Sequence, residues 1–213
     1  MRDETLYGAA LILSAVGMLA TGAFHPTGHQ LLASPEAIAH VGLVNKVVHG
    51  MALGSVWLSF FGVVGLSRRL GLQRLDVTAA LAAFAMGVMA LTCAAVTDGI
   101  VATELANGLV GADEATRSGI MPLLRLCGLI ASSMSRFDVA AVSVAMLLWS
   151  VAMMRTGFSR ALSWVGVIIG AVGLLALFSG HLRMNVHDLI AMVVGQSIWT
   201  VWTGIALSRH RES

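Results

Sequence analysis

Charged side chains are scarce in this sequence. Asp, Glu, Lys and Arg make up 11% of the 213 residues and hydrophobic residues 57%, whereas soluble domains contain roughly 25% charged residues. The net charge is only +2, and no segment clusters several Lys or Arg. We therefore expect neither a nucleic-acid partner nor a basic site for anionic lipids. The composition instead predicts a chain that needs the lipid bilayer around it.

Cysteines and familiar enzyme motifs are also few. Cys93 and Cys127 lie in or beside apolar segments without C-x-x-C spacing, so we expect buried, inert thiols and no disulfide. The sequence lacks the G-x-S-x-G serine motif, a phosphate-binding glycine loop and the H-E-x-x-H zinc motif. Function must therefore be inferred from the placement of single polar residues.

Long apolar runs are abundant instead. A hydrocarbon core of about 30 Å is crossed by about 20 apolar residues, and six runs have about this length: 6–24, 41–66, 77–96, 137–154, 161–178 and 189–207. These runs are continuously apolar, whereas barrel strands would alternate. We predict an all-α fold, a six-transmembrane-helix bundle in which residues 1–213 form a single integral membrane domain.

The segment 99–136 is the one long region between predicted spans. Asp113 and Glu114 suit a loop, and Pro122 is placed like the first-turn proline of a helix. We therefore predict a short outer-face helix before the fourth span. This helix either lies in the membrane interface or continues directly into that span.

Basic residues indicate the orientation of the spans. The two short turns 67–69 and 155–160 and the tail 208–211 are all rich in arginine, and short basic segments stay on the cytoplasmic side. We predict a multi-pass protein of the cell (inner) membrane with both termini in the cytoplasm. Trp57, Trp149 and Trp199 precede these basic segments and are interpreted as interfacial anchors.

Histidines gather at the opposite, outer ends of the spans. In this topology only His210 is inside, and the other six are outside: His25, His29, His40, His49, His181 and His187. Asp98, Asp138 and Asp188 are expected beside them at helix ends. The two sides are therefore chemically distinct.

Several polar residues share helical faces. Three groups have this spacing: Ser14, Met18, Thr21 and His25; Asn45 and His49; and Asp188, Met192, Gln196, Thr200 and Thr203. Because ionisable and amide groups are costly in lipid, these stripes should turn toward the bundle interior. His49 lies about two turns inside its span, where it either ligates something or is satisfied locally by Asn45.

Imidazole and carboxylate groups suit zinc, copper or iron. The candidate metal ligands are His25, His49, Asp98, His181, His187 and Asp188. Haem b would need two axial histidines on facing helices, for which the candidates are His25, His49 and His181.

Three classes of function follow from these features. The first is a subunit, or a cofactor- or metal-binding component, of a larger membrane complex, in which small residues permit close contacts with other subunits or with a second copy. The second is an intramembrane metal-dependent or redox enzyme. The third is a small-solute or metal-ion transporter, which is weakened because no span shows a charge in mid-membrane.

Overall fold

The computed structural model describes residues 2–26, 35–182 and 186–209. Within these ranges the chain is helical and contains no β-strand. In chain order, the helices are α1 (Arg2–Phe24), α3 (Pro35–Leu70), α4 (Leu75–Val96), the π-helix η1 (Thr97–Val101), α5 (Ala102–Asn107), α6 (Glu114–Arg155), α7 (Arg160–Phe178) and α8 (Val186–Arg209). The all-α prediction is confirmed.

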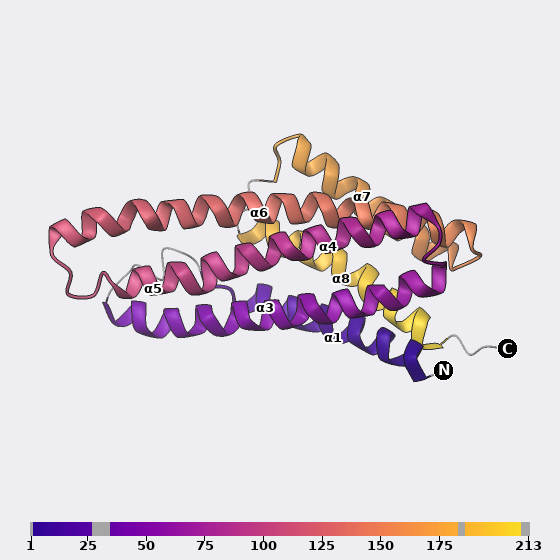
Figure 1. The fold of residues 1–213 in the computed structure, drawn as a ribbon, viewed down its shortest axis with the longest axis horizontal. Helices are drawn as coiled ribbons and strands as arrows, with labels where there is room; N and C mark the ends of the chain where they lie inside the picture. Colours follow the sequence, from indigo (N-terminus) through magenta and orange to yellow (C-terminus); the bar gives the residue numbers. More distant parts are fainter. Residues whose placement is uncertain (1, 27–34, 183–185, 210–213) are drawn as a thin grey trace.

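Six helices of the described chain are long and apolar enough to cross a membrane. α4, η1 and α5 run on as one of these six, 33 residues from Leu75 to Asn107. The lengths fall into two groups, because α1, α7 and α8 have 23, 19 and 24 residues whereas α3 and α6 have 36 and 42. At 1.5 Å per residue, α6 is about 63 Å long, roughly twice a hydrocarbon core. In Figure 1, α3, α5 and α6 extend together beyond α1 and α8.

The two ends of the bundle differ in their charged residues. Arg68, Arg69, Arg155 and Arg160 lie at the turns that join α3 to α4 and α6 to α7, and Figure 1 shows both chain termini at this same end. We call it the arginine end, and we call the other end, toward which α1 runs to His25, the histidine end.

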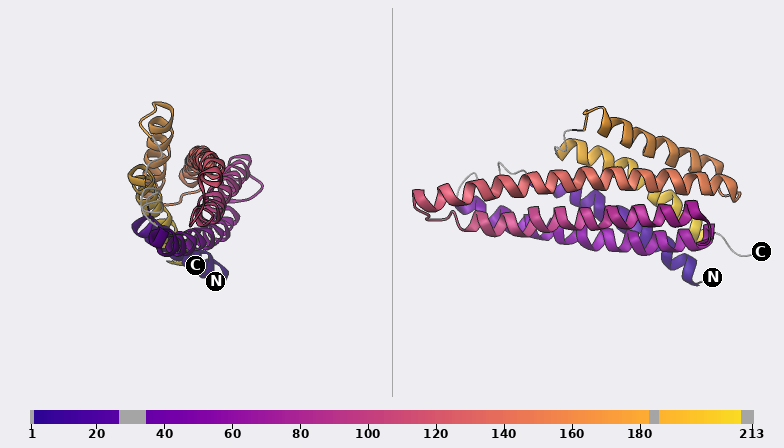
Figure 2. Two further views of the ribbon diagram at one scale, coloured as in Figure 1. Left: turned by 90° about the vertical axis from the view of Figure 1, so that its left-hand side faces the viewer. Right: turned by 45° about the horizontal axis from the view of Figure 1, so that its top comes forward.

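The helices surround a central space in an open ring. α1 packs against α3 and α8, α4 packs against α3 and α6, and α7 packs chiefly against α6 with only a small contact to α8. The end-on view in Figure 2 shows α7 and α8 on the side of the ring away from α4, with α7 in contact with α6.

Glycines allow the close approach of neighbouring helices. A Cβ atom added at Gly8 would lie 2.4 Å from the carbonyl oxygen of Gly204, and one at Gly166 would lie 2.1 Å from Ser150 Oγ. Similar intrachain contacts are made at Gly17, Gly62, Gly87, Gly170 and Gly173, whereas Gly54 has nothing within 4 Å. Packing within the chain therefore accounts for all of these glycines except Gly54.

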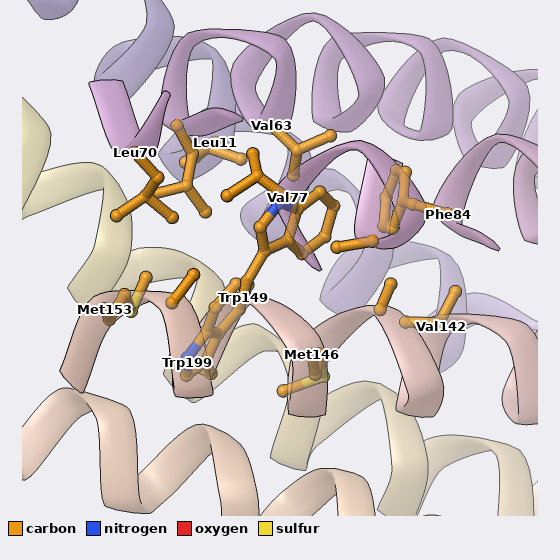
Figure 3. Close-up of a cluster of buried hydrophobic side chains, with 14 of the residues drawn as sticks. Leu11, Val63, Leu70, Val77, Phe84, Val142, Met146, Trp149, Met153 and Trp199 are labelled. Atoms are coloured by element: carbon orange, nitrogen blue, oxygen red, sulfur yellow. The ribbon is translucent and has the colours of Figure 1, made fainter. Parts of the chain in front are cut away.

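An aromatic cluster fills the core toward the arginine end. Trp149 is fully buried and Trp199 is 2% exposed, and their stacked rings lie 6.2 Å apart by centroid. Trp149 Nε1 donates a hydrogen bond of 3.0 Å to Ser67 Oγ, which links α6 to α3. Figure 3 shows this cluster with Phe84 beside it. The interpretation of Trp149 and Trp199 as interfacial anchors is wrong, because both rings pack in the protein core.

The segment before the fourth span is more helical than expected. Asp113 caps the N-terminus of α6 by accepting a hydrogen bond from the Thr116 backbone N–H, and Pro122 lies inside the helix. The expectation that a helix starts at Pro122 is therefore wrong, and the alternative of a helix continuous with the fourth span is the one observed. Cys93 is exposed and Cys127 buried, both as free thiols, so the expectation of burial fails for Cys93.

Candidate metal site and intramembrane cavity

A cavity of about 480 Å³ lies inside the ring of helices. Its lining comes from α1, α3, α4, η1, α6 and α8 and includes most of the two longer stripes that the sequence predicts to face inward: Ser14, Met18, Thr21, His25, Met192, Gln196 and Thr200. Along α4 the lining extends from Phe84 to Ala95 and continues to Asp98 in η1. At 1.5 Å per residue this is a length of about 21 Å, so the cavity is elongated along the bundle.

Three of the predicted ligands meet at the histidine end of this cavity. His49 Nε2 lies 3.3 Å from Asp98 Oδ2, and His25 Nε2 lies 3.9 Å from the same oxygen. The imidazole centroids of His25 and His49 are 4.9 Å apart in an edge-on arrangement. One ligand atom from each of the three residues lies within 4.8 Å of the other two. The predicted His/Asp cluster therefore exists, with these three members.

Both imidazoles are held by backbone carbonyls on their other nitrogen. His49 Nδ1 is 2.8 Å from the carbonyl oxygen of Asn45, and His25 Nδ1 is 2.8 Å from that of Pro26. A carbonyl oxygen only accepts hydrogen bonds, so each Nδ1 carries the proton and donates it. When the rings are neutral, each Nε2 therefore has a lone pair with which to bind a metal ion. Metal-binding histidines are characteristically held in this way.

Asp98 is positioned by a change in helix type. It lies in η1, the π-helical turn between α4 and α5, and such turns are frequent at functional sites. Asn45 Nδ2 donates to the backbone oxygen of Asp98 at 3.0 Å and to Thr103 Oγ1 at 3.1 Å. The Asn45 side chain thus links α3 to η1 and α5, while the backbone carbonyl oxygen of Asn45 orients His49.

Gly99 allows His49 to approach this turn closely. A Cβ atom at Gly99 would lie only 2.4 Å from both Cβ and Cγ of His49. A residue with any side chain at this position would displace the imidazole. Neither Gly99 nor Thr103 stands out in the sequence, because their roles depend on contacts between separate helices.

The net charge of the cluster depends on the protonation of its two imidazoles. Burial, followed by the repulsion of a charged His49, lowers the pKa of His25 below its ordinary value of 6.5. His49 is 6% exposed, and its Nε2 faces the Asp98 carboxylate. With neutral imidazoles, the cluster offers two nitrogen lone pairs and one carboxylate, a set that a positive ion satisfies.

The remaining predicted ligands are not part of this group in the described chain. His181 is exposed and its Nδ1 is 2.8 Å from Ser179 Oγ. His187 lies in the first turn of α8, but its side chain is outside the described residues, and Asp188 follows it as a partly buried residue. His40 is exposed, and His29 and His210 lie outside the described residues.

Asp138 occupies a place that the sequence did not indicate. It lines the cavity, and its Oδ1 would lie 3.0 Å from a Cβ atom added at Gly87. Gly87 is 12 residues after Leu75 and 11 before Asp98, so it lies about 16 Å along the helix axis from Asp98. Asp138, on α6, lies at the level of Gly87 and is therefore about 16 Å from the cluster. The expectation that Asp138 marks a helix end is wrong, because α6 begins at Glu114 and ends at Arg155.

Comparison with known protein families, with curated proteins and with solved structures finds no match for this chain.

Proposed function

We propose that this chain is a multi-pass protein of the cell (inner) membrane that binds one divalent transition-metal ion at its outer end, through His25, His49 and Asp98. The observation that carries this proposal is the convergence of three ligand atoms, one from each residue. Two of them belong to imidazoles that are each held through Nδ1 by a backbone carbonyl. The arginine end faces the cytoplasm in this proposal, because short basic turns and both termini gather there.

The distances suit a small ion. Zinc binds imidazole nitrogen at about 2.0–2.1 Å and carboxylate oxygen at about 2.0–2.2 Å, so ligand atoms of a tetrahedral site are separated by about 3.3 Å. The His49–Asp98 separation is already 3.3 Å, and the His25–Asp98 separation of 3.9 Å needs a closure of less than 1 Å. The ligand atoms of the group lie within 4.8 Å of one another, so the widest pair needs to close by at most about 1.5 Å. Copper and iron accept the same ligands, so zinc serves as the test ion for the whole class.

Haem b is a poorer fit to the same residues. Two axial histidines need a porphyrin plane between their rings, but His25 and His49 have centroids only 4.9 Å apart and lie edge to face. Both Nε2 atoms also face one oxygen of Asp98, which occupies the place of the iron. The geometry therefore favours a compact ion over a macrocycle.

Metal-dependent catalysis is the second candidate function. Catalytic zinc sites keep three protein ligands and leave a fourth position for water or substrate, and this cluster has three ligands at the end of a cavity. A metal ion there would lower the pKa of a bound water and so supply a nucleophile near neutral pH. The residues of the chain would hold the ion and shield it, with Asp98 as ligand.

The geometry gives less support to the subunit hypothesis and to the transporter hypothesis. A role as a subunit of a larger complex, with other chains or a second copy as partners, stays a prediction. Transport of a small solute gains one supporting observation, because Asp138 supplies the mid-span charge that the sequence appeared to lack.

Metal content of single variants tests the proposal. Protein purified in detergent, loaded with zinc and dialysed should contain one zinc per chain, and His49→Ala, His25→Ala and Asp98→Asn should each lose it. His181→Ala is the matched control, because His181 is exposed and separate from the cluster, and it should keep the metal. Zinc retained in all three cluster variants, or lost equally in the control, contradicts the proposal.

A further inference from the structure

Asp138 has no partner for its charge within the described chain. It has no hydrogen bond or ion pair to any described residue. Elsewhere in the described structure, the acidic groups Glu4, Asp76, Asp98 and Glu104 each face a basic side chain. An unpaired carboxylate in an apolar interior is costly, so an ionisable residue within a span is by default a functional group.

The cavity around Asp138 is suited to a positive ligand. The ionisable residues of its described lining are His25, His49, Asp98 and Asp138, and no Lys or Arg lines it. Most of the lining is apolar, with alanine, valine and leucine from α3, α4 and α6. Serine, threonine and glutamine side chains are also part of the lining. In the deep part of the cavity, about 16 Å from Asp98, a ligand would therefore meet the carboxylate of Asp138 on a wall that is mostly apolar.

Aromatic rings form the floor of the cavity near this carboxylate. Phe84 lies one turn from Gly87 on α4, and both Phe84 and Trp199 line the cavity. Trp149 packs behind them, 5.5 Å from Phe84 and 6.2 Å from Trp199 by ring centroid. Figure 3 shows the three rings together. Faces of tryptophan and phenylalanine attract organic cations, most strongly when the cation is desolvated.

We propose that the deep part of the cavity binds an organic cation with a single positive charge and an apolar body, a protonated amine or a quaternary ammonium, whose charge pairs with Asp138. A volume of about 480 Å³ is in the range of small-molecule sites and far exceeds the space of a bare ion. One carboxylate neutralises one charge, whereas a metal ion takes several charged or polar ligands, as the cluster about 16 Å away provides.

This site is separate from the metal site, and the experiment measures amine binding and zinc binding independently. Wild-type protein in lipid nanodiscs is dialysed against phenethylamine or against phenethyl alcohol, which has the same body without the charge, and uptake by empty nanodiscs is subtracted. The amine should bind at least about tenfold more tightly than the alcohol, since a charge pair in this environment contributes more than 1.4 kcal/mol. Equal affinity for the two compounds overturns the proposal without any variant.

Variants then assign the charge to its residue. Asp138→Asn keeps the shape and removes the charge, so it should lower the affinity for the amine to that for the alcohol while zinc content stays unchanged. Glu104→Gln, an acidic residue outside the cavity that pairs with Lys46, is the control and should bind the amine as the wild type does. Loss of zinc without loss of amine binding in His49→Ala would show the two sites to be independent.

Each result decides one of the two proposals. Unchanged amine binding in Asp138→Asn overturns the organic-cation site, whatever the metal content. Absence of zinc from wild-type protein overturns the metal site and leaves the amine measurement intact. The Asn variant should fold, because removing an unpaired buried charge relieves a desolvation penalty.

Discussion

Replacing Gly99 with alanine should weaken metal binding although residue 99 is not a ligand. The new methyl carbon would lie 2.4 Å from Cβ and Cγ of His49 and 3.0 Å from its Nδ1, whereas ordinary contacts begin near 3.4 Å. The imidazole must therefore retreat by about 1 Å, while metal–ligand distances tolerate shifts of only about 0.2 Å.

The size of the effect follows from this displacement. Changes to residues that support metal ligands typically cost about 10- to 100-fold in affinity, which is about 1.4–2.7 kcal/mol. Folding stability should change less, because the gain of about 1 kcal/mol for alanine over glycine in a helix partly offsets about 1–3 kcal/mol of overpacking. Zinc affinity, measured by competition with a chromophoric chelator in detergent, should fall more than thermal stability does.

Gly50→Ala is the matched control for this experiment. Gly50 follows His49 on α3, and a Cβ atom there meets nothing within 4 Å, so this variant should bind zinc as tightly as the wild type. Wild-type affinity in Gly99→Ala, or equal weakening in both variants, would refute the reasoning that places His49 against η1.

Three further predictions concern the supports of the site, the helix packing and pH. Asn45→Ala removes hydrogen bonds to Asp98 and Thr103 and should destabilise the protein by about 1–3 kcal/mol; an unchanged melting temperature would contradict the link between α3 and η1. Gly166→Ala places a methyl group 2.1 Å from Ser150 Oγ and 2.5 Å from Trp199 Nε1 and should cost about 1–3 kcal/mol, whereas Gly128→Ala, with open space around it, should cost nothing by thermal unfolding. Zinc affinity should fall below pH 6.5, where protons compete with the metal ion for His25, because burial lowers the pKa of His25 below its ordinary value of 6.5; an affinity that rises on acidification would exclude histidine ligands.

The length and apolar character of the helices could be read from the sequence. The predicted spans 6–24, 77–96 and 161–178 lie within α1, α4 and α7. The fourth prediction, 137–154, covers only the second half of α6, because Pro122 indicates the start of a separate helix before the span. This shortened span placed Asp138 at a helix end, although the helix begins 24 residues earlier.

The members of the cluster were among the candidates, but their selection was not predictable. His25, His49 and Asp98 come together because η1 sets the direction of Asp98 and Gly99 admits the ring of His49. A single π-helical turn and an interhelical contact leave no periodic pattern in a sequence. His181 is also a histidine that the sequence places on the outer side, as it does His25 and His49. Only the arrangement of the helices separates His181 from the cluster.

An X-ray absorption spectrum of the zinc-loaded, dialysed protein tests the central claim most directly. We expect one zinc per chain, with two imidazole nitrogens at about 2.0–2.1 Å and a carboxylate oxygen at about 2.0–2.2 Å, and no bound zinc in His25→Ala. Zinc absent from the wild-type protein, or bound with only oxygen neighbours and no imidazole scattering, would contradict the metal site.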